Sequence, residues 1–264
     1  MENLFWLLRN KVILNNGNLK STKIVWFYPT AMSRGHVGQF ETAWRDAYSK
    51  YFGGDINNVT KMTESEAPYK YFAQARGNVD NIVTVDIGGG TTDVVFAAGG
   101  QIQCLTSFRF AANNLFSDPY AKSVIVGIVD LYKNTIGSTI HDNLEDKPTE
   151  KVFNDVIDAG NSSDIASFFF SLSSNSEIVE KKLTKLVDFN KMLQDDGRFK
   201  IIFVLFYASL VYHVASLMKA KTLPMPRHIA FSGNGSKVIS VLSPDSNIIK
   251  DFTKMILAIL RKME

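Results

Sequence analysis

The 264-residue sequence predicts an α/β protein. Three observations support this fold class. Segments with apolar residues at helical spacing alternate with short runs rich in Ile, Val and Phe. Three of these runs follow one another closely near the middle of the chain, and glycine runs connect them. The composition, 45% hydrophobic and 21% charged, is that of a globular protein with a sizeable core.

The first eighty residues or so predict helices and short strands in alternation. Asparagine and glycine at 15–18 tolerate the left-handed backbone that ends a helix. Pro29 stops a strand, and Pro68 is favoured at a helix start. The predicted order is helix 3–14, strand 23–28, helix 38–50, strand 59–62 and helix 68–76.

The middle of the chain predicts an antiparallel meander. Its strands cover residues 81–86, 91–98 and 101–109. Short glycine connections suit antiparallel neighbours, because parallel strands need a long crossover. The segment 118–190 predicts mostly helix with irregular loops. After it we expect a helix at 199–220, a strand at 228–231, a turn at 232–236 and a closing helix at 247–263.

The segment 201–218 carries no formal charge and is long enough to span a membrane. Polar residues within it favour a helix buried on most sides inside a soluble protein instead, and no membrane span is predicted. These polar residues are Tyr207, Ser209, Tyr212, His213 and Ser216.

The charge and cysteine content narrow the classes of partner and compartment. The net charge of +3 is too small to argue for a nucleic-acid partner. Cys104 is the single cysteine, so no internal disulfide forms, and we expect a reducing compartment, the cytoplasm. Four scattered histidines give no zinc-site spacing.

Residues 86–93 predict a phosphate site. Asp86 ends an apolar strand, where a carboxylate points into the loops that bind ligands in open α/β sheets. The three glycines that follow allow close approach of a ligand and supply successive N–H groups for an anion. The alternative is a plain glycine-rich hairpin turn. Predicted phosphate contacts are Gly88, Gly89, Gly90, Thr91 and Thr92, and predicted ligands of hydrated Mg²⁺ are Asp86 and Asp93.

This run resembles the second phosphate motif of the superfamily that includes actin, the seventy-kilodalton heat-shock chaperones, bacterial actin-like filament and division proteins, and sugar kinases. That motif is Asp-hydrophobic-Gly-Gly-Gly-Thr-x-Asp on a β-hairpin, and residues 86–93 match it throughout. The resemblance implies a ribonuclease-H-like lobe that binds ATP or ADP. It also implies that Asp86 holds water around Mg²⁺, and that residues 88–91 hold the β- and γ-phosphates.

Residues 229–237 resemble the adenosine motif of the same superfamily, a strand that enters a glycine turn and then a helix. The resemblance implies that Gly233 and Gly235 let adenine and ribose lie against the backbone, with Ser236 or Lys237 reaching the base or sugar. Asn234 stands where relatives often have glycine, a mild departure because asparagine tolerates left-handed backbone. The alternative is a simple strand-to-helix turn.

Residues 63–68 resemble the segment in which relatives place a Glu or Gln that orients the attacking water. Glu66 and Asp86 are the predicted catalytic residues, and Glu64 is the alternative to Glu66 as the water-orienting acid. The alternative is capping of the helix that follows, because acidic side chains favour helix N-termini. The sequence leaves both open.

The resemblance covers one half of the superfamily's pattern. No Asp-x-Gly-Thr hairpin, the first phosphate motif, precedes Asp86. We therefore expect 1–80 to be the C-terminal part of an incomplete first lobe, and 81–264 to be a complete second lobe with a helical insertion at about 118–190. The chain is then either the C-terminal part of a longer protein or a diverged relative that has lost the N-terminal hairpins, and the sequence leaves both open. An N-terminal half or another protein chain would cover the open sheet.

Two functions follow from this organisation. The first is an actin- or chaperone-like domain that binds ATP, and hydrolyses it only when joined to the missing half. The second is a non-catalytic interaction or assembly module that retains the actin-like fold. Whether the role is that of a chaperone, a filament or a kinase stays open.

Overall fold

The computed structural model describes residues 1–77, 80–116, 127–242, 245, 247, 250–252, 254–256 and 258. The chain divides into two compact units. Met1–Asp80 and Val95–Ser107 form the first, and Asn81–Val94 and Phe108–Glu264 form the second. Helices and strands alternate through the chain, so the predicted α/β class is confirmed.

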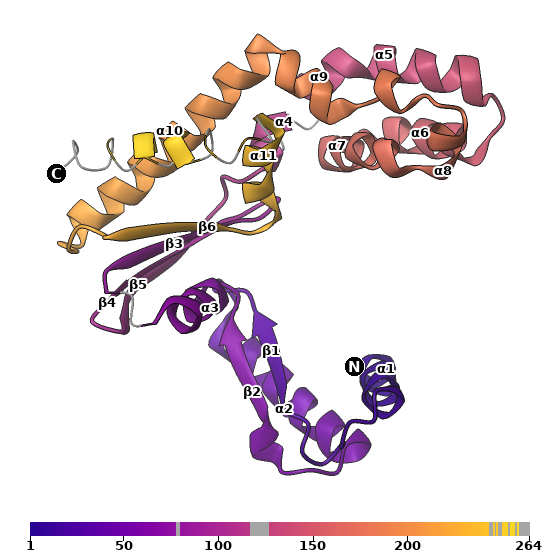
Figure 1. Ribbon diagram of the computed structural model, residues 1–264. Helices are drawn as coiled ribbons and strands as arrows, with labels where there is room; N and C mark the ends of the chain where they lie inside the picture. Colours follow the sequence, from indigo (N-terminus) through magenta and orange to yellow (C-terminus); the bar gives the residue numbers. More distant parts are fainter. Residues whose placement is uncertain are drawn as a thin grey trace. The chain divides into compact units, whose positions relative to one another are not determined.

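The first unit contains a two-stranded parallel sheet (Figure 1). Its elements are α1 (Glu2–Leu14), β1 (Ile24–Tyr28), α2 (Arg34–Tyr51), η1 (Ile56–Asn58), β2 (Val59–Thr63) and α3 (Glu66–Arg76). Ile24 lies opposite Val59, and Tyr28 lies opposite Thr63. All five predicted elements are present. The helix predicted from residue 38 begins earlier, at Arg34, because the Ser33 hydroxyl accepts the His36 N–H and caps it.

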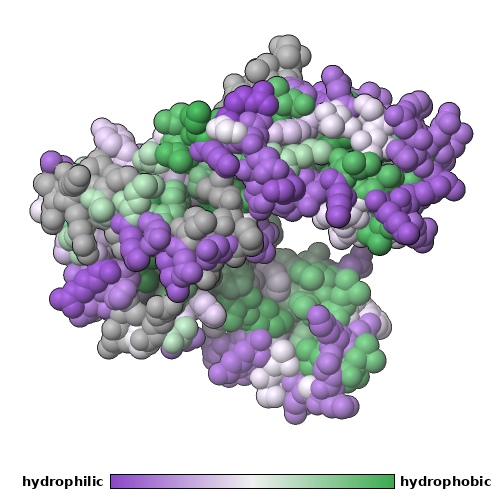
Figure 2. Space-filling view, turned by 45° about the horizontal axis from the view of Figure 1, so that its top comes forward, coloured by the Kyte–Doolittle hydropathy of each residue, from purple (hydrophilic) through white to green (hydrophobic). Residues whose placement is uncertain are grey.

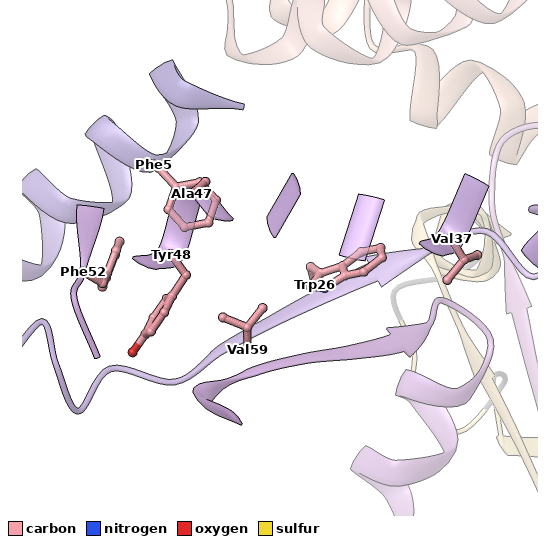
Figure 3. Packing of buried hydrophobic residues seen from close by; sticks show 7 residues of the cluster. All are labelled: Phe5, Trp26, Val37, Ala47, Tyr48, Phe52 and Val59. Carbon is pink, nitrogen blue, oxygen red and sulfur yellow. The ribbon is translucent and has the colours of Figure 1, made fainter. Parts of the chain in front are cut away.

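The core of the first unit forms between the two long helices and β1 (Figure 3). The Phe5 ring contacts the rings of Trp44 and Phe52 edge-on, with centroid distances of 5.2 and 5.9 Å. The Tyr48 hydroxyl donates to the Thr22 carbonyl at 2.8 Å, which satisfies a buried polar group. The buried members are Phe5, Trp26, Val37, Ala47, Tyr48, Phe52 and Val59.

The second sheet has the strand order β5-β4-β3-β6. Its strands are β3 (Ile82–Ile87), β4 (Thr92–Ala98), β5 (Gln101–Phe108) and β6 (His228–Ser232). The predicted meander and the later strand are therefore confirmed. The sequence did not predict that β6 pairs with β3 in parallel, from Ile82 opposite His228 to Asp86 opposite Ser232.

Helices make up most of the second unit (Figure 1). They are α4 (Asn113–Phe116), α5 (Ile128–Leu144), α6 (Pro148–Ala159), α7 (Ser162–Ser171), η2 (Leu172–Ser174), α8 (Ser176–Glu180), η3 (Thr184–Leu186), α9 (Phe189–Asp195), α10 (Gly197–Ala220), η4 (Asn234–Val238) and α11 (Ile239–Leu242). The helical character predicted for 118–190 is confirmed from residue 128 onward, and 117–126 lie outside the described residues. Within the closing helix predicted at 247–263, every described position is helical.

Helix α10 lies against the sheet with one of its faces. The Tyr207 ring contacts the Phe231 ring of β6 at 5.8 Å, and the Phe108 ring of β5 contacts the His213 ring at 4.5 Å. The buried stripe recurs every three or four residues: Phe199, Phe203, Phe206, Tyr207, Leu210, Val211, Val214 and Met218. Ile201, Leu205 and Tyr212 on the other side are 62 to 64% exposed. The prediction of burial on most sides is therefore wrong, because the side opposite the buried stripe is largely exposed.

In the described part of the chain, α10 is the one helix long and apolar enough to cross a membrane. Of its most apolar window, 39% is buried within the protein. Core helices of soluble proteins pass the same length and composition test, so this finding does not distinguish the two environments.

Candidate functional site

The predicted phosphate loop leaves β3 at the edge of the sheet. Its first strand is buried from Ile82 to Ile87 except at Asp86, which is partly exposed. Three backbone bonds hold the base of the loop. Gly88 N–H donates to the Thr91 carbonyl at 2.9 Å, and the N–H groups of Ala112 and Asn113 donate to the Gly88 and Gly89 carbonyls at 3.1 and 2.9 Å. The loop is therefore fixed from below by its own backbone and by the start of α4.

The tip of this loop is open. Gly89, Gly90 and Thr91 are exposed. The N–H groups of Gly89 and Gly90 donate to no protein atom among the residues described. A Cβ on Gly90 would meet no heavy atom within 4 Å, whereas one on Gly89 would lie 3.3 Å from Asn113 Oδ1. Two neighbouring unpaired amides at an open tip suit an anion such as a phosphate.

Thr92 corrects one of the predicted phosphate contacts. Its side chain is fully buried, and its hydroxyl donates to the Phe110 carbonyl at 2.6 Å. Successive strand residues point to opposite faces, so Thr92 turns inward while Asp93 is partly exposed. The Thr92 hydroxyl therefore helps to support the loop and is not available to a phosphate.

The predicted adenosine turn packs directly on the phosphate loop. Gly233 follows β6 with a φ of +81°, and a Cβ there would overlap Asp86 Oδ1 and the Ile87 carbonyl oxygen. A Cβ on Gly235 would lie 2.7 Å from the Gly88 carbonyl oxygen and from Ile87 Cγ2. The resemblance implied that these glycines leave room for adenine and ribose. In the structure the end of β3 occupies the Cβ positions of both glycines, so the glycines are needed for the two loops to touch, and their contact with adenine and ribose stays a prediction.

Polar groups of the second turn divide into two sets. Ser236 closes the turn on itself, with its N–H and hydroxyl donating to the Gly233 carbonyl at 3.2 and 2.7 Å. Asn234 and Lys237 are exposed, and no hydrogen bond of their side chains is found within the described structure. Lys237 and Asn234 are therefore the side chains of this turn that remain available to a ligand, and Ser236 serves mainly the turn.

Glu66 lies in the first unit and makes a reciprocal cap. Its carboxylate accepts the Thr63 N–H at 3.2 Å, and its own N–H donates to the Thr63 hydroxyl at 3.2 Å. This is the capping-box arrangement of a helix start. Glu64 is exposed, and its N–H donates to the Tyr28 carbonyl at 3.0 Å. Capping by Glu66 is thus observed, while the role of either acid in orienting water stays a prediction.

The carboxylates of the loop suit a hydrated cation. The described residues include no group of three or more His, Cys, Asp or Glu that could enclose a metal ion. Asp86 and Asp93 stand partly exposed on either side of the glycine loop. Mg²⁺ keeps several waters and is commonly held by one or two carboxylates together with substrate phosphates, so this donor set fits Mg²⁺ that arrives with a nucleotide.

Sequence reasoning missed two parts of this site. The first is the backbone of Ala112 and Asn113, whose N–H groups donate to carbonyls of the loop. Backbone groups occur in every residue, so no residue type in the sequence indicates this contact. The second is the place of Ser232 opposite Asp86 in the ladder; the sequence put Ser232 in the adenosine motif but gave it no strand partner. Knowledge that β3 pairs with β6 would have placed Ser232 opposite Asp86. The periodicity of a strand does not determine which strand it pairs with.

No protein-family model matches this chain, and no curated protein matches it. Solved structures do. MreB5 of Spiroplasma citri bound to ADP is 18% identical with a TM-score of 0.30, over 58% of this chain and 39% of that one. The Ppx/GppA phosphatase of Aquifex aeolicus is 16% identical with a TM-score of 0.31, over 53% and 46%. The ethanolamine utilization protein EutJ of Carboxydothermus hydrogenoformans is 12% identical with a TM-score of 0.35, over 90% and 62%.

These three proteins are members of the actin-like ATPase superfamily, which residues 86–93 also resemble. The chain spans less than two thirds of the length of each. Because every TM-score is below 0.5, we base the function on the residues of the chain itself.

Proposed function

We propose that this chain supplies one phosphate loop and the adenosine-side turn of an ATP- or ADP-binding site of the actin-like kind. One observation carries the proposal: the turn at Gly233 and Gly235 touches residues 86–88, while the neighbouring amides of Gly89 and Gly90 stay open. Both loops follow the carboxyl ends of adjacent parallel strands. That edge is where open α/β sheets bind their ligands.

Each group has a distinct task in the proposed site. The amides of Gly89 and Gly90 and the hydroxyl of Thr91 donate to phosphate oxygens, which are strong acceptors. Lys237 adds positive charge on the side of the second turn. Asp86 and Asp93 accept hydrogen bonds from the waters of Mg²⁺, and the cation, when bound, neutralises phosphate charge.

Hydrolysis needs more than these two loops. In-line attack on a phosphate requires positioned contacts on the transferred group and an acceptor that orients the water. We propose that an N-terminal half or another protein chain supplies the first phosphate motif, with Glu66 or Glu64 as the water-orienting acid. For the chain as given, we expect weak binding of Mg·ATP and negligible release of phosphate.

Calorimetric titration of Mg·ADP and Mg·ATP tests the proposal. Asp86→Ala removes the carboxylate, and Gly90→Val places bulk at the open tip, where a Cβ meets no heavy atom within 4 Å. We expect each variant to weaken binding about tenfold or more, because a hydrogen bond to a charged group contributes about 1.5–3 kcal/mol. Gly197→Ala is the control, since a Cβ there also meets nothing within 4 Å. Equal titrations for all four proteins would refute a nucleotide at this loop.

A non-catalytic assembly module is the second candidate, and exposed apolar side chains favour it. Leu7 and Leu14 of α1 are 69% and 82% exposed, and Phe27 of β1 is 51% exposed. Hydrophobic areas are also visible between hydrophilic ones on the face in Figure 2. A two-stranded sheet keeps unpaired edges that another strand can join. Flat titrations together with concentration-dependent oligomers in light scattering would favour this function over nucleotide binding.

A further inference from the structure

Asn113 of α4 joins the phosphate loop to α7, a helix much later in the chain. Its backbone N–H donates to the Gly89 carbonyl at 2.9 Å, and its side-chain Oδ1 accepts the Ser163 hydroxyl of α7 at 3.2 Å. Aromatic rings of the same two helices are also in contact, with 5.6 Å between the centroids of Phe116 and Phe170. The side chain of Asn113 is therefore held between the loop and the helical segment.

The end of the Asn113 side chain lies against the exposed part of the loop. A Cβ on Gly89 would lie 3.3 Å from Asn113 Oδ1 and 3.7 Å from Asn113 Nδ2. Gly89 is exposed and Asn113 is partly exposed, so the absence of a side chain at Gly89 leaves this amide uncovered on the side of the loop. A ligand at the loop tip therefore meets the Asn113 amide as well as the backbone.

The bond to Ser163 determines which part of the amide remains for a ligand. An asparagine side chain has one acceptor oxygen and two N–H donors. The Ser163 hydroxyl donates to the oxygen, and no partner of Asn113 Nδ2 is found among the residues that the structure describes. Nδ2 thus joins the backbone N–H groups of Gly89 and Gly90 as a donor without a protein acceptor. Such a set of donors suits the oxygens of a phosphate, which are strong acceptors.

We propose that Asn113 Nδ2 donates to the phosphate bound at Gly89 and Gly90, and that Ser163 holds the amide in the orientation this bond requires. Asn113 is then a phosphate-binding residue, and Ser163 is a positioning residue in the helical segment. The sequence placed the phosphate contacts at 88–92 alone and gave the helical segment no part in the site. This inference rests on the proposed function and extends its site to α7.

Asn114 is the matched control. Its Oδ1 accepts the Ala111 N–H at 3.0 Å, within the turn that leads into α4. Asn113→Asp and Asn114→Asp each keep the acceptor oxygen that the protein uses, lose the N–H donors and add one negative charge. The atoms nearest to a Cβ on Gly89 all belong to Asn113, so the two substitutions differ mainly in their distance from the loop tip.

Calorimetry with Mg·ADP on the full chain tests both residues. We expect Asn113→Asp to weaken binding about tenfold or more, because a charge that repels phosphate replaces a donor, and Asn114→Asp to stay within about twofold of wild type. Ser163→Ala should weaken binding about two- to fivefold, since the amide is no longer held in one orientation. Ser163→Thr keeps the hydroxyl and should restore the affinity.

Side-chain amide NMR of the wild-type chain gives a second readout, which does not depend on the folding of any variant. Once the Asn113 Nδ2 signals are assigned, Mg·ADP should shift them, because a hydrogen bond to phosphate forms at this group. Adenosine, which has no phosphate, should leave them in place. The Asn114 Nδ2 signals should not move with either ligand.

Three results would overturn the inference and leave the proposed function standing. In the first, wild type binds Mg·ADP while the Asn113 signals do not move. In the second, Asn113→Asp and Asn114→Asp weaken binding equally, which would indicate a general effect of charge. In the third, Ser163→Ala lowers the thermal midpoint but binds Mg·ADP as wild type does, which would leave Ser163 a structural role alone. If wild type binds no Mg·ADP, the proposed function and this inference both fail.

Discussion

The two glycine-containing loops at the edge of the second sheet use the same residue for opposite purposes. At Gly90 a Cβ would meet open space, while at Gly233 and Gly235 it would meet the end of β3. In the first loop the missing side chains leave the amides of Gly89 and Gly90 accessible to a ligand. In the second loop the missing side chains allow Gly233 and Gly235 to pack against residues 86–88.

This difference separates the part of the site that binds from the part that supports. Gly90 and Thr91 can change with little effect on packing, since both are exposed and a Cβ on Gly90 meets nothing within 4 Å. Gly233 and Gly235 set the distance between the two loops, and a side chain there would push the loops apart. Stability and nucleotide affinity should therefore respond to different positions within a few ångströms of each other.

The largest expected effect is at Gly233. Gly233→Ala combines a left-handed backbone with an overlap on Asp86 Oδ1 and the Ile87 carbonyl, so we expect a loss of about 2–4 kcal/mol in the free energy of unfolding. Gly90→Ala should change stability by less than about 1 kcal/mol. Urea unfolding of both variants measures this. Equal destabilisation by the two substitutions would remove the distinction between the loops.

Sequence reasoning found the first loop almost to the residue, for a physical reason. An apolar strand, three glycines and flanking acids form one continuous local signal, and β3 begins and ends within one residue of the predicted 81–86. The resemblance also pointed to 229–237, whose strand is observed as β6. What a local signal does not contain is the pairing of β3 with β6, because that contact joins segments far apart in the chain.

Two predicted roles depended on the orientation of a side chain, which the sequence alone does not determine. Thr92 was chosen with Thr91 as a hydroxyl donor, yet strand alternation turns it into the core. Glu66 fits both a water-orienting acid and the last position of a capping box that starts at Thr63. Helices as short as α4 have too few residues to show a periodicity. The hydrogen bond from the Asn113 N–H to the loop was therefore not predictable either.

The next largest effect is expected at Asp196, a carboxylate at the start of α10 and away from the two glycine loops. Asp196 caps α10 by accepting the Arg198 N–H at 2.7 Å, and it also accepts the Tyr132 hydroxyl at 2.7 Å. Its side chain is only 7% exposed. Asp196→Ala should cost about 2–3 kcal/mol in stability, from the lost cap and the lost bond to α5. Nucleotide affinity should not change.

Asp196 also gives the stability a pH dependence. The hydrogen bond from the Arg198 guanidinium holds the pKa of Asp196 well below its usual range, and burial together with this carboxylate raises the pKa of Tyr132 to about 12. A depressed pKa stabilises the fold above the unfolded value of about 3.9, and this contribution is lost as the pH falls below it. Thermal unfolding between pH 3 and 7 should therefore show a smaller acid loss for Asp196→Asn than for wild type. Parallel curves would contradict this account.

The smallest expected effect is at Thr92, and it tests the division between binding and support most directly, because Thr92 immediately follows the exposed Thr91. Thr92→Val keeps the shape of the side chain and deletes the bond to the Phe110 carbonyl, so we expect a loss of about 1 kcal/mol in stability and unchanged affinity for Mg·ADP. Thr91→Val should do the reverse, weakening Mg·ADP while leaving stability within about 0.5 kcal/mol, since its side chain is exposed. Chemical unfolding and calorimetry on the same two variants give all four values. If Thr92→Val also weakened binding, the loop would depend on its support for its working geometry, and binding and support would no longer be separable at neighbouring residues.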